Sequence, residues 1–321
     1  MPPLLDAIIR HQIYLEGLKA GQLRTFLQTS KAIEKDVRAK LLGLNYDTMD
    51  GLTKAQLRVL LADLREVSNR HYSAYVISLI KFLQKFMRVD TAIVKGLYAP
   101  YADDDSGPAD FGALASEDRR WGVLAAAPLP ASGALLIPWV RALATAGTGA
   151  ILLQVNRAYA NRASVRDTVA AIVGTSEANG KDGVLGRTNN TARAVINTAL
   201  QHVSANNQAG IAKILWPRYR WVSVLDDRTT NICRSRDGNI YLYDKGPLPP
   251  AHPGCRSSIM PIAAGQDIDK MPTFNEWAKR QPGDILRDMF GTAKPGPSFG
   301  APTPLTLEEF EAKKGRILQD G

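Results

Sequence analysis

The residues best suited to chemistry lie in one short stretch that contains both cysteines of the chain, Cys233 and Cys255, together with His252. The spacing His-Pro-Gly-Cys places an imidazole and a thiol on one tight loop. Thiolate and imidazole are ligands that Zn²⁺ prefers, and two thiols can instead form one disulfide. The pattern therefore indicates a metal knuckle or a disulfide clip. With three ligands visible, Asp226, Asp237 or a water molecule would supply the fourth.

The acidic turn before Cys233 has two interpretations. Asp226 and Asp227 could be a catalytic acid pair, but Asp226-Asp227-Arg228-Thr229 equally suits the capping of a short helix through a carboxylate and a hydroxyl. We favour capping, with Arg228 forked onto a nearby carboxylate. The sequence has no phosphate-binding Gly-rich loop and no HExxH, and its four histidines are dispersed, at His11, His71, His202 and His252. We therefore expect a protein that is not an enzyme.

The order of these residues resembles the Mu F-like family of phage minor head proteins. In that family a tryptophan strand leads into Asp-x-Arg-Thr-Cys-x-x-Cys, an Asp-Gly turn and a Pro-rich His-Pro-x-Cys-Arg-Cys. The matching residues are Trp221, Asp226, Arg228, Thr229, Cys233, Asp237, Gly238, Pro249, Pro250, His252, Pro253, Cys255 and Arg256. Two further matches follow, at 273–282 and 305–310, so the resemblance covers roughly residues 150 to 316.

The chain departs from the family at two positions, because Thr230 and Ser257 stand where the family often has its other two cysteines. The four-cysteine zinc spacing is therefore incomplete. We expect Cys233 and Cys255 to pack as small apolar groups or to form one disulfide, with His252 and Arg256 hydrogen-bonded to the loop. Zinc bound by Cys233, His252 and Cys255 is the alternative.

The resemblance implies a small α+β domain similar to the ADP-ribosyltransferase fold. It also implies a minor head protein that is made in the cytoplasm of a bacterial host and lies inside the capsid, in several copies near the portal. Its expected partners are the portal protein, other head proteins and packaged double-stranded DNA, with no membrane in the assembled state. Its expected role is head morphogenesis, and possible exit with the genome during ejection.

Two other functions remain open at this point. A virion-delivered enzyme of the ADP-ribosyltransferase or nuclease type would need a cleft that gathers Arg220 or Arg228 with an acidic residue. No catalytic Glu can be placed after Ser223, since Glu276 lies on a predicted helix beyond the sheet. A DNA-binding structural protein would use basic residues of the second helix, at Lys81, Lys85 and Arg88.

Composition sets the scale of the molecule. With 321 residues, 45% of them hydrophobic, the chain is long enough for two folded units. The net charge of +9 suits an acidic partner, but the basic excess of residues 1–98 is interspersed with acids, which is typical of solvated helix faces. The N-terminus lacks the pattern of a secretory signal. The apolar run 131–153 contains Pro138 and Arg141, which favours packed helices over a membrane span.

The pattern along the chain predicts an α+β protein in four parts. Residues 1–98 form a helical arm, with one helix over 4–43 and a second from a capping box at Thr53 and Gln56. The apolar stripe of this hairpin must be covered, and we favour neighbouring subunits as the cover. Residues 99–133 are a loop, 134–292 the Mu F-like domain, and 293–321 a linker with a terminal helix. Strands are expected at 219–225, 239–243 and 257–262, with Trp221 and Trp277 as core anchors.

Overall fold

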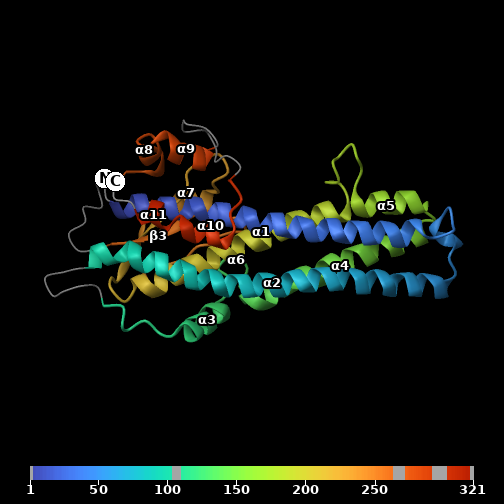
Figure 1. Ribbon diagram of the computed structural model, residues 1–321, viewed down its shortest axis with the longest axis horizontal. Helices are drawn as coiled ribbons and strands as arrows, with labels where there is room; N and C mark the ends of the chain where they lie inside the picture. The colour runs from blue at the N-terminus through green and yellow to red at the C-terminus, as the bar shows by residue number, and fades with distance from the viewer. Residues whose placement is uncertain (1–2, 103–109, 263–271, 291–301, 319–321) are drawn as a thin grey trace. The chain divides into compact units, whose positions relative to one another are not determined.

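The computed structural model describes residues 3–102, 110–262, 272–290 and 302–318 (Figure 1). The protein is α+β, mostly helical with one three-stranded antiparallel sheet. It divides into two compact units, of which the first holds residues 1–22, 82–136 and 196–321 and the second holds residues 23–81 and 137–195. The expected boundaries near 98 and 133 differ from this division. Helical periodicity gives the length of a helix, but it does not say that different parts of one helix pack in different units.

The described residues form four long helices and seven shorter ones. The long helices are α1 (Pro3–Leu42), α2 (Lys54–Ala102), α4 (Leu136–Ala160) and α6 (Val184–Ala212). The shorter ones are α3 (Glu117–Ala126), α5 (Val165–Val173), α7 (Asn231–Arg236), α8 (Phe274–Ala278), α9 (Gly283–Phe290), α10 (Leu307–Ala312) and α11 (Lys314–Leu318). A single 3₁₀ turn, η1 (Met49–Gly51), lies between α1 and α2.

Local signals at the helix ends explain where several of these helices begin. The predicted capping box at α2 is confirmed, since Thr53 N–H donates to Gln56 Oε1 at 2.9 Å and Gln56 N–H donates to Thr53 Oγ1 at 3.3 Å. Helix α3 lies within the segment expected to be a loop, so that expectation is wrong for 117–126. Ser116 caps this helix by accepting from Arg119 N–H. Residues 103–109 and 291–301 of the expected loop and linker lie outside the described residues.

The second unit is built from the C-terminal part of α1, the N-terminal part of α2, α4, α5 and the start of α6. Phe26 on α1 contacts Tyr75 on α2 edge to face, with ring centroids 4.9 Å apart. Tyr72 packs so closely on Gly147 of α4 that a Cβ there would lie 2.8 Å from the ring. The apolar stripe of the hairpin is thus covered within its own unit, and the expectation that neighbouring subunits cover it is wrong for these residues.

The first unit contains the sheet, in the order β2-β1-β3. Its strands are β1 (Arg218–Val222), β2 (Ile240–Leu242) and β3 (Ser258–Pro261), within or beside the three expected ranges. Trp221 pairs with Ile259, and both side chains are fully buried. They form one core cluster with Tyr219, Ala209 of α6 and both cysteines. The alternation of β1 therefore turns its two aromatic residues toward the cysteines.

The N-terminal part of α1 fixes the C-terminal segments of the first unit. Asp6 accepts a hydrogen bond from Trp277 Nε1 at 2.8 Å, and Trp277 is fully buried, as expected of a core anchor. Leu305 N–H donates to the Gly17 carbonyl at 2.9 Å. A Cβ at Gly21 would lie 2.0 Å from the carbonyl oxygen of Leu305, so only glycine permits this approach. In Figure 1, α10 and α11 accordingly lie along α1.

Helix α4 corresponds to the apolar run noted in the sequence. Among the described residues it is the one helix whose length and composition would allow it to cross a membrane. Its buried residues recur at helical spacing, for example Val140, Leu143, Ala144 and Ile151. Arg141 lies exposed between them. These residues pack α4 into the protein along one face.

Candidate functional site

Asp226 organises the turn that leads from β1 to α7. Its Oδ1 accepts from Arg228 N–H at 3.0 Å, and its own N–H donates to Thr229 Oγ1 at 2.9 Å. Arg256 forks onto both carboxylate oxygens at 2.6 and 2.5 Å. These bonds outweigh burial and raise the pKa of Arg256. Both carboxylate oxygens of Asp226 therefore accept hydrogen bonds that hold the turn together.

Two expectations about this turn need correction. The fork partner is Arg256 and not Arg228, whose side chain is 56% exposed and whose Nη2 lies 3.9 Å from Asp226. Asp226 and Thr229 were expected to cap a short helix, but they close a turn instead. Helix α7 begins at Asn231, and its N-cap residue, Thr230, makes no side-chain cap bond. Arg256 was missed as the partner because it lies on a distant loop, which only the register of β1 and β3 brings here.

The carboxylate of Asp237 is likewise hydrogen-bonded, in this case to a backbone N–H. Its Oδ1 accepts from Ser223 N–H at 2.7 Å, and burial raises the pKa of its carboxyl group. Ser223 Oγ accepts from Trp221 Nε1 at 2.9 Å and donates to the Cys233 carbonyl at 2.9 Å. Neither Asp226 nor Asp237 therefore turns toward the cysteines as the fourth ligand that the sequence suggested.

Three predicted ligands do converge. Cys233 Sγ lies 3.2 Å from His252 Nε2 and 3.7 Å from Cys255 Sγ, and the three atoms lie within 4.8 Å of one another. Both cysteines are buried free thiols, so of the two alternatives the structure has packed thiols and not a disulfide. His252 Nδ1 lies 3.0 Å from the Pro253 carbonyl, which can only accept a hydrogen bond. Nδ1 therefore carries a proton, and Nε2 is the ring nitrogen that faces Cys233.

The electrostatics of the two cysteines are opposite. Hydrogen bonding from Cys255, against the effect of burial, lowers the pKa of Cys233 to about 6, and the hydroxyls of Ser257 and Thr230 contribute in the same direction. The same contact with Cys233 raises the pKa of Cys255 well above its usual value. Of the two thiols, Cys233 is therefore the one that loses its proton more easily. The two positions where the family often has cysteines, Thr230 and Ser257, both face the sulfur of Cys233.

The alternative function, an ADP-ribosyltransferase or nuclease, would require a cleft, and none is formed around Arg220 in the described residues. Arg220 lies beside Asp237, and the cavity there has a volume of about 10 Å³. Ligand pockets are typically larger than about 300 Å³, so a nucleotide does not fit. Arg228, the other candidate, is exposed on its turn.

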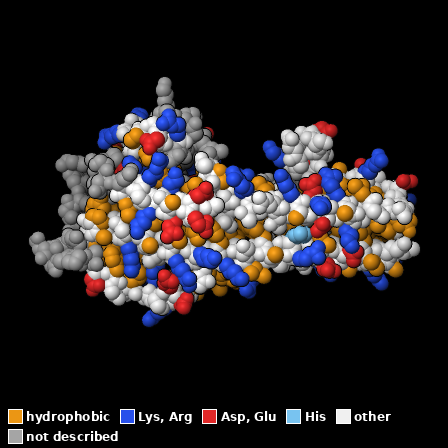
Figure 2. All heavy atoms as spheres, in the orientation of Figure 1, with side chains coloured by type: hydrophobic (Ala, Val, Ile, Leu, Met, Phe, Trp, Pro, Cys, Tyr) orange, Lys and Arg blue, Asp and Glu red, His pale blue; other side chains and the backbone are white. Residues whose placement is uncertain are grey.

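The candidate DNA-binding residues are only partly available. Lys81, Lys85 and Arg88 are exposed on α2, but Arg88 forms an ion pair with Glu117 at 2.9 Å. On the face drawn in Figure 2, basic and acidic side chains are interspersed. This agrees with solvated helix faces, as the sequence predicted.

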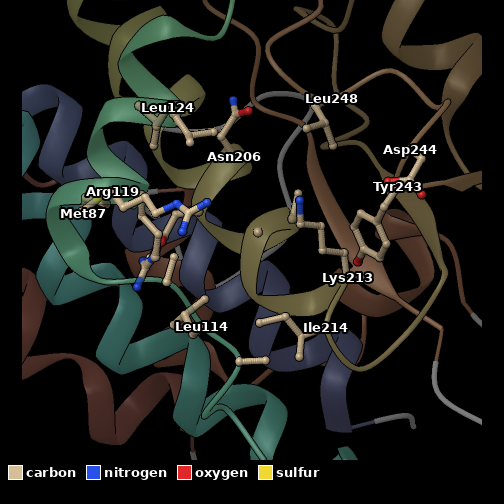
Figure 3. A pocket seen from close by; sticks show the side chains of 17 residues that line it. Met87, Leu114, Arg119, Leu124, Asn206, Lys213, Ile214, Tyr243, Asp244 and Leu248 are labelled. Carbon is tan, nitrogen blue, oxygen red and sulfur yellow. Dashed lines mark hydrogen bonds between the residues drawn. The ribbon is translucent and has the colours of Figure 1, made fainter.

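Sequence reasoning missed a cavity of about 310 Å³ in the first unit (Figure 3). Its wall includes Arg120, which donates to Thr91 Oγ1 and Asn207 Oδ1. Behind it, Asn207 donates to Asp90 at 2.7 Å, and Asp90 contacts His11 Nε2 at 2.7 Å. Four side chains, one from each of four helices, thus form a hydrogen-bonded chain that fixes the guanidinium of Arg120 at the cavity.

Cationic and apolar side chains are mixed along the wall of the cavity, which also includes the carboxylate of Asp244. Arg119 and Lys213 reach toward its middle in Figure 3, and the apolar lining includes Leu124 and Leu248. Burial lowers the pKa of Arg120, against the attraction of nearby carboxylates. Such a lining complements an anion with an apolar body. The sequence signal for its helix was Ser116 followed by two acids, a helix N-terminus within the supposed loop.

The fold and the site together define an α+β protein in which two buried thiols and one half-buried imidazole form a cluster beside the small sheet. Comparison of the chain with protein-family models, with curated proteins and with solved structures finds no match in any of the three.

Proposed function

We propose that this chain is a phage minor head protein, located inside the capsid beside the portal and acting in head morphogenesis. The observation that carries the proposal is the convergence of the motif residues. Trp221, Cys233 and Cys255 share one core, while Asp226 and Arg256 close the turn beside it. Residues that match the family motif thus act together as one structural unit, which is what a shared domain requires.

The role we propose is binding and not bond-making. The two carboxylates that an active site could use form structural hydrogen bonds instead. Asp226 binds Arg256, and Asp237 accepts from the backbone N–H of Ser223. Next to them, the edge strand β2 exposes Ile240 and Leu242, at 40% and 44%, on the side opposite Tyr241. An edge strand with exposed apolar side chains is suited to contact with another protein.

The experiment is co-expression of the full chain with the portal protein of the phage that encodes it, followed by mass spectrometry under native conditions. We expect a complex that is weakened at least tenfold by the double substitution I240D/L242D. The matched control is V59D, which also adds a charge at an exposed apolar residue, on α2. Absence of any portal complex, together with absence of the chain from purified virions, would contradict the proposal.

A further inference from the structure

We infer that Cys233, His252 and Cys255 bind one zinc ion, although Thr230 and Ser257 stand where the resembling family often has two more cysteines. This goes beyond the proposed role in the head and does not depend on it. The ligand set is two thiolates and one imidazole, which together neutralise most or all of the charge of a divalent ion. Such a set is typical of zinc in proteins.

The distances agree with a metal better than with a disulfide. Two sulfurs bound at about 2.3 Å with a tetrahedral angle lie about 3.8 Å apart, and Cys233 Sγ and Cys255 Sγ are 3.7 Å apart. A disulfide bond requires about 2.05 Å between the sulfurs, so the pair would have to close by more than 1.5 Å. The sulfurs are thus already at the separation that the ion needs.

The imidazole is oriented as a ligand. Metal-binding histidines usually donate their other ring N–H to a carbonyl or carboxylate, which fixes the tautomer. His252 does this through Nδ1 and the Pro253 carbonyl, and its Nε2 faces the sulfur of Cys233 at 3.2 Å. The widest separation among the three ligand atoms, within 4.8 Å, has to shorten by about 1 Å for tetrahedral binding. His252 lies half-buried on a loop, where such a shift is easier than in the sheet.

The fourth coordination position is left to water or to a hydroxyl. Thr230 and Ser257 lie near enough to stabilise the thiolate of Cys233, but a neutral hydroxyl is a weaker zinc ligand than a thiolate. We therefore expect weaker binding than at a four-cysteine site. The ion would connect α7, which carries Cys233, to the loop before β3, which carries the other two ligands. Its effect is to stabilise the sheet against unfolding.

The test is titration of the reduced, metal-free full chain with Co²⁺ and then Zn²⁺. Co²⁺ reports thiolate ligation and tetrahedral geometry by its absorption, and native mass spectrometry counts the zinc ions. We expect one ion per chain, a rise of several degrees in the melting temperature, loss of the spectrum in C255S, and at least tenfold weaker binding in H252A. The matched control H71A removes a half-buried histidine of the second unit and should bind as the parent does.

The His252→Ala variant keeps the experiment decisive if a cysteine variant fails to fold, because this loop side chain is not in the core. Absence of stoichiometric uptake by the reduced parent chain would overturn the inference. So would equal uptake by H252A and the parent, or by a double variant that lacks both thiols. These outcomes are independent of portal binding, so failure here and failure of the proposed function are distinguishable.

Discussion

Two buried polar clusters of the first unit show opposite ways of placing polar groups in a core. In the network His11–Asp90–Asn207–Arg120, groups of complementary kind alternate, so each donor meets an acceptor. In the cluster Cys233–His252–Cys255, three groups that can all donate electron pairs face one another. Buried polar groups are normally satisfied by partners. Both clusters are hydrogen-bonded internally, but only the second consists of groups that can each also ligate a metal ion.

The two clusters also connect different parts of the chain. The network joins α1, α2, α6 and α3, which are remote in sequence, and so specifies how these helices pack. The cysteine cluster joins segments that lie within 22 residues of each other. The network between distant helices therefore supports the fold, whereas the cysteine cluster gathers potential metal ligands from one short stretch of the chain. The predictions below test this contrast.

The largest effect is expected at Asp90, which is fully buried. Asp90→Ala leaves His11 and Asn207 without their shared partner, and loss of one member of a buried charged network lowers the free energy of unfolding by about 3–5 kcal/mol. Urea denaturation would measure it. The control is Asp63→Ala, whose ion pair with Lys40 is exposed and should contribute under about 1 kcal/mol. Equal effects of the two substitutions would remove the contrast between buried network and surface.

A smaller effect is expected at the turn beside the cysteines. Arg256→Gln leaves the buried carboxylate of Asp226 without its fork and should lower the free energy of unfolding by about 2–3 kcal/mol. Arg228→Gln, on the same carboxylate but 56% exposed, should change it by less than about 0.5 kcal/mol. The measurement is again urea denaturation, in metal-free buffer. A larger loss for the Arg228 variant would show that the fork is assigned to the wrong arginine.

The smallest effect is a pH dependence at His202, which is buried on α6. Burial lowers the pKa of His202, although its bond to the Leu124 carbonyl acts in the opposite direction. Below pH 6.5 the unfolded chain binds a proton there that the folded chain does not, so stability falls as pH falls. The difference between the parent and His202→Gln, measured by denaturation at pH 7.5 and 5.5, isolates this contribution. A parent chain whose stability falls no more steeply than that of the variant would contradict it.

Local signals were sufficient for most elements. The capping box at Thr53 and Gln56, the helical stripe of α1 and the alternation around Trp221 each depend on neighbours in sequence, and each element forms within a few residues of its expected place. Helix α3 was missed because acidic, Gly- and Pro-rich residues before it dominated the composition of its segment. The cavity at Arg119 and Arg120 was missed for the same reason, and no sequence pattern links those residues to Asn207.

The sequence by itself determined most of the helices and strands and the set of candidate metal-ligating side chains, because periodicity, turn chemistry and residue type are local properties. Only the tertiary structure decided which of those side chains meet. The pairing of β1 with β3 brings Arg256 onto Asp226 and leaves that carboxylate unavailable as a ligand. The same pairing holds the loop that places His252 and Cys255 at Cys233. Convergence of this kind depends on the register and packing of segments distant in sequence, which no local pattern encodes.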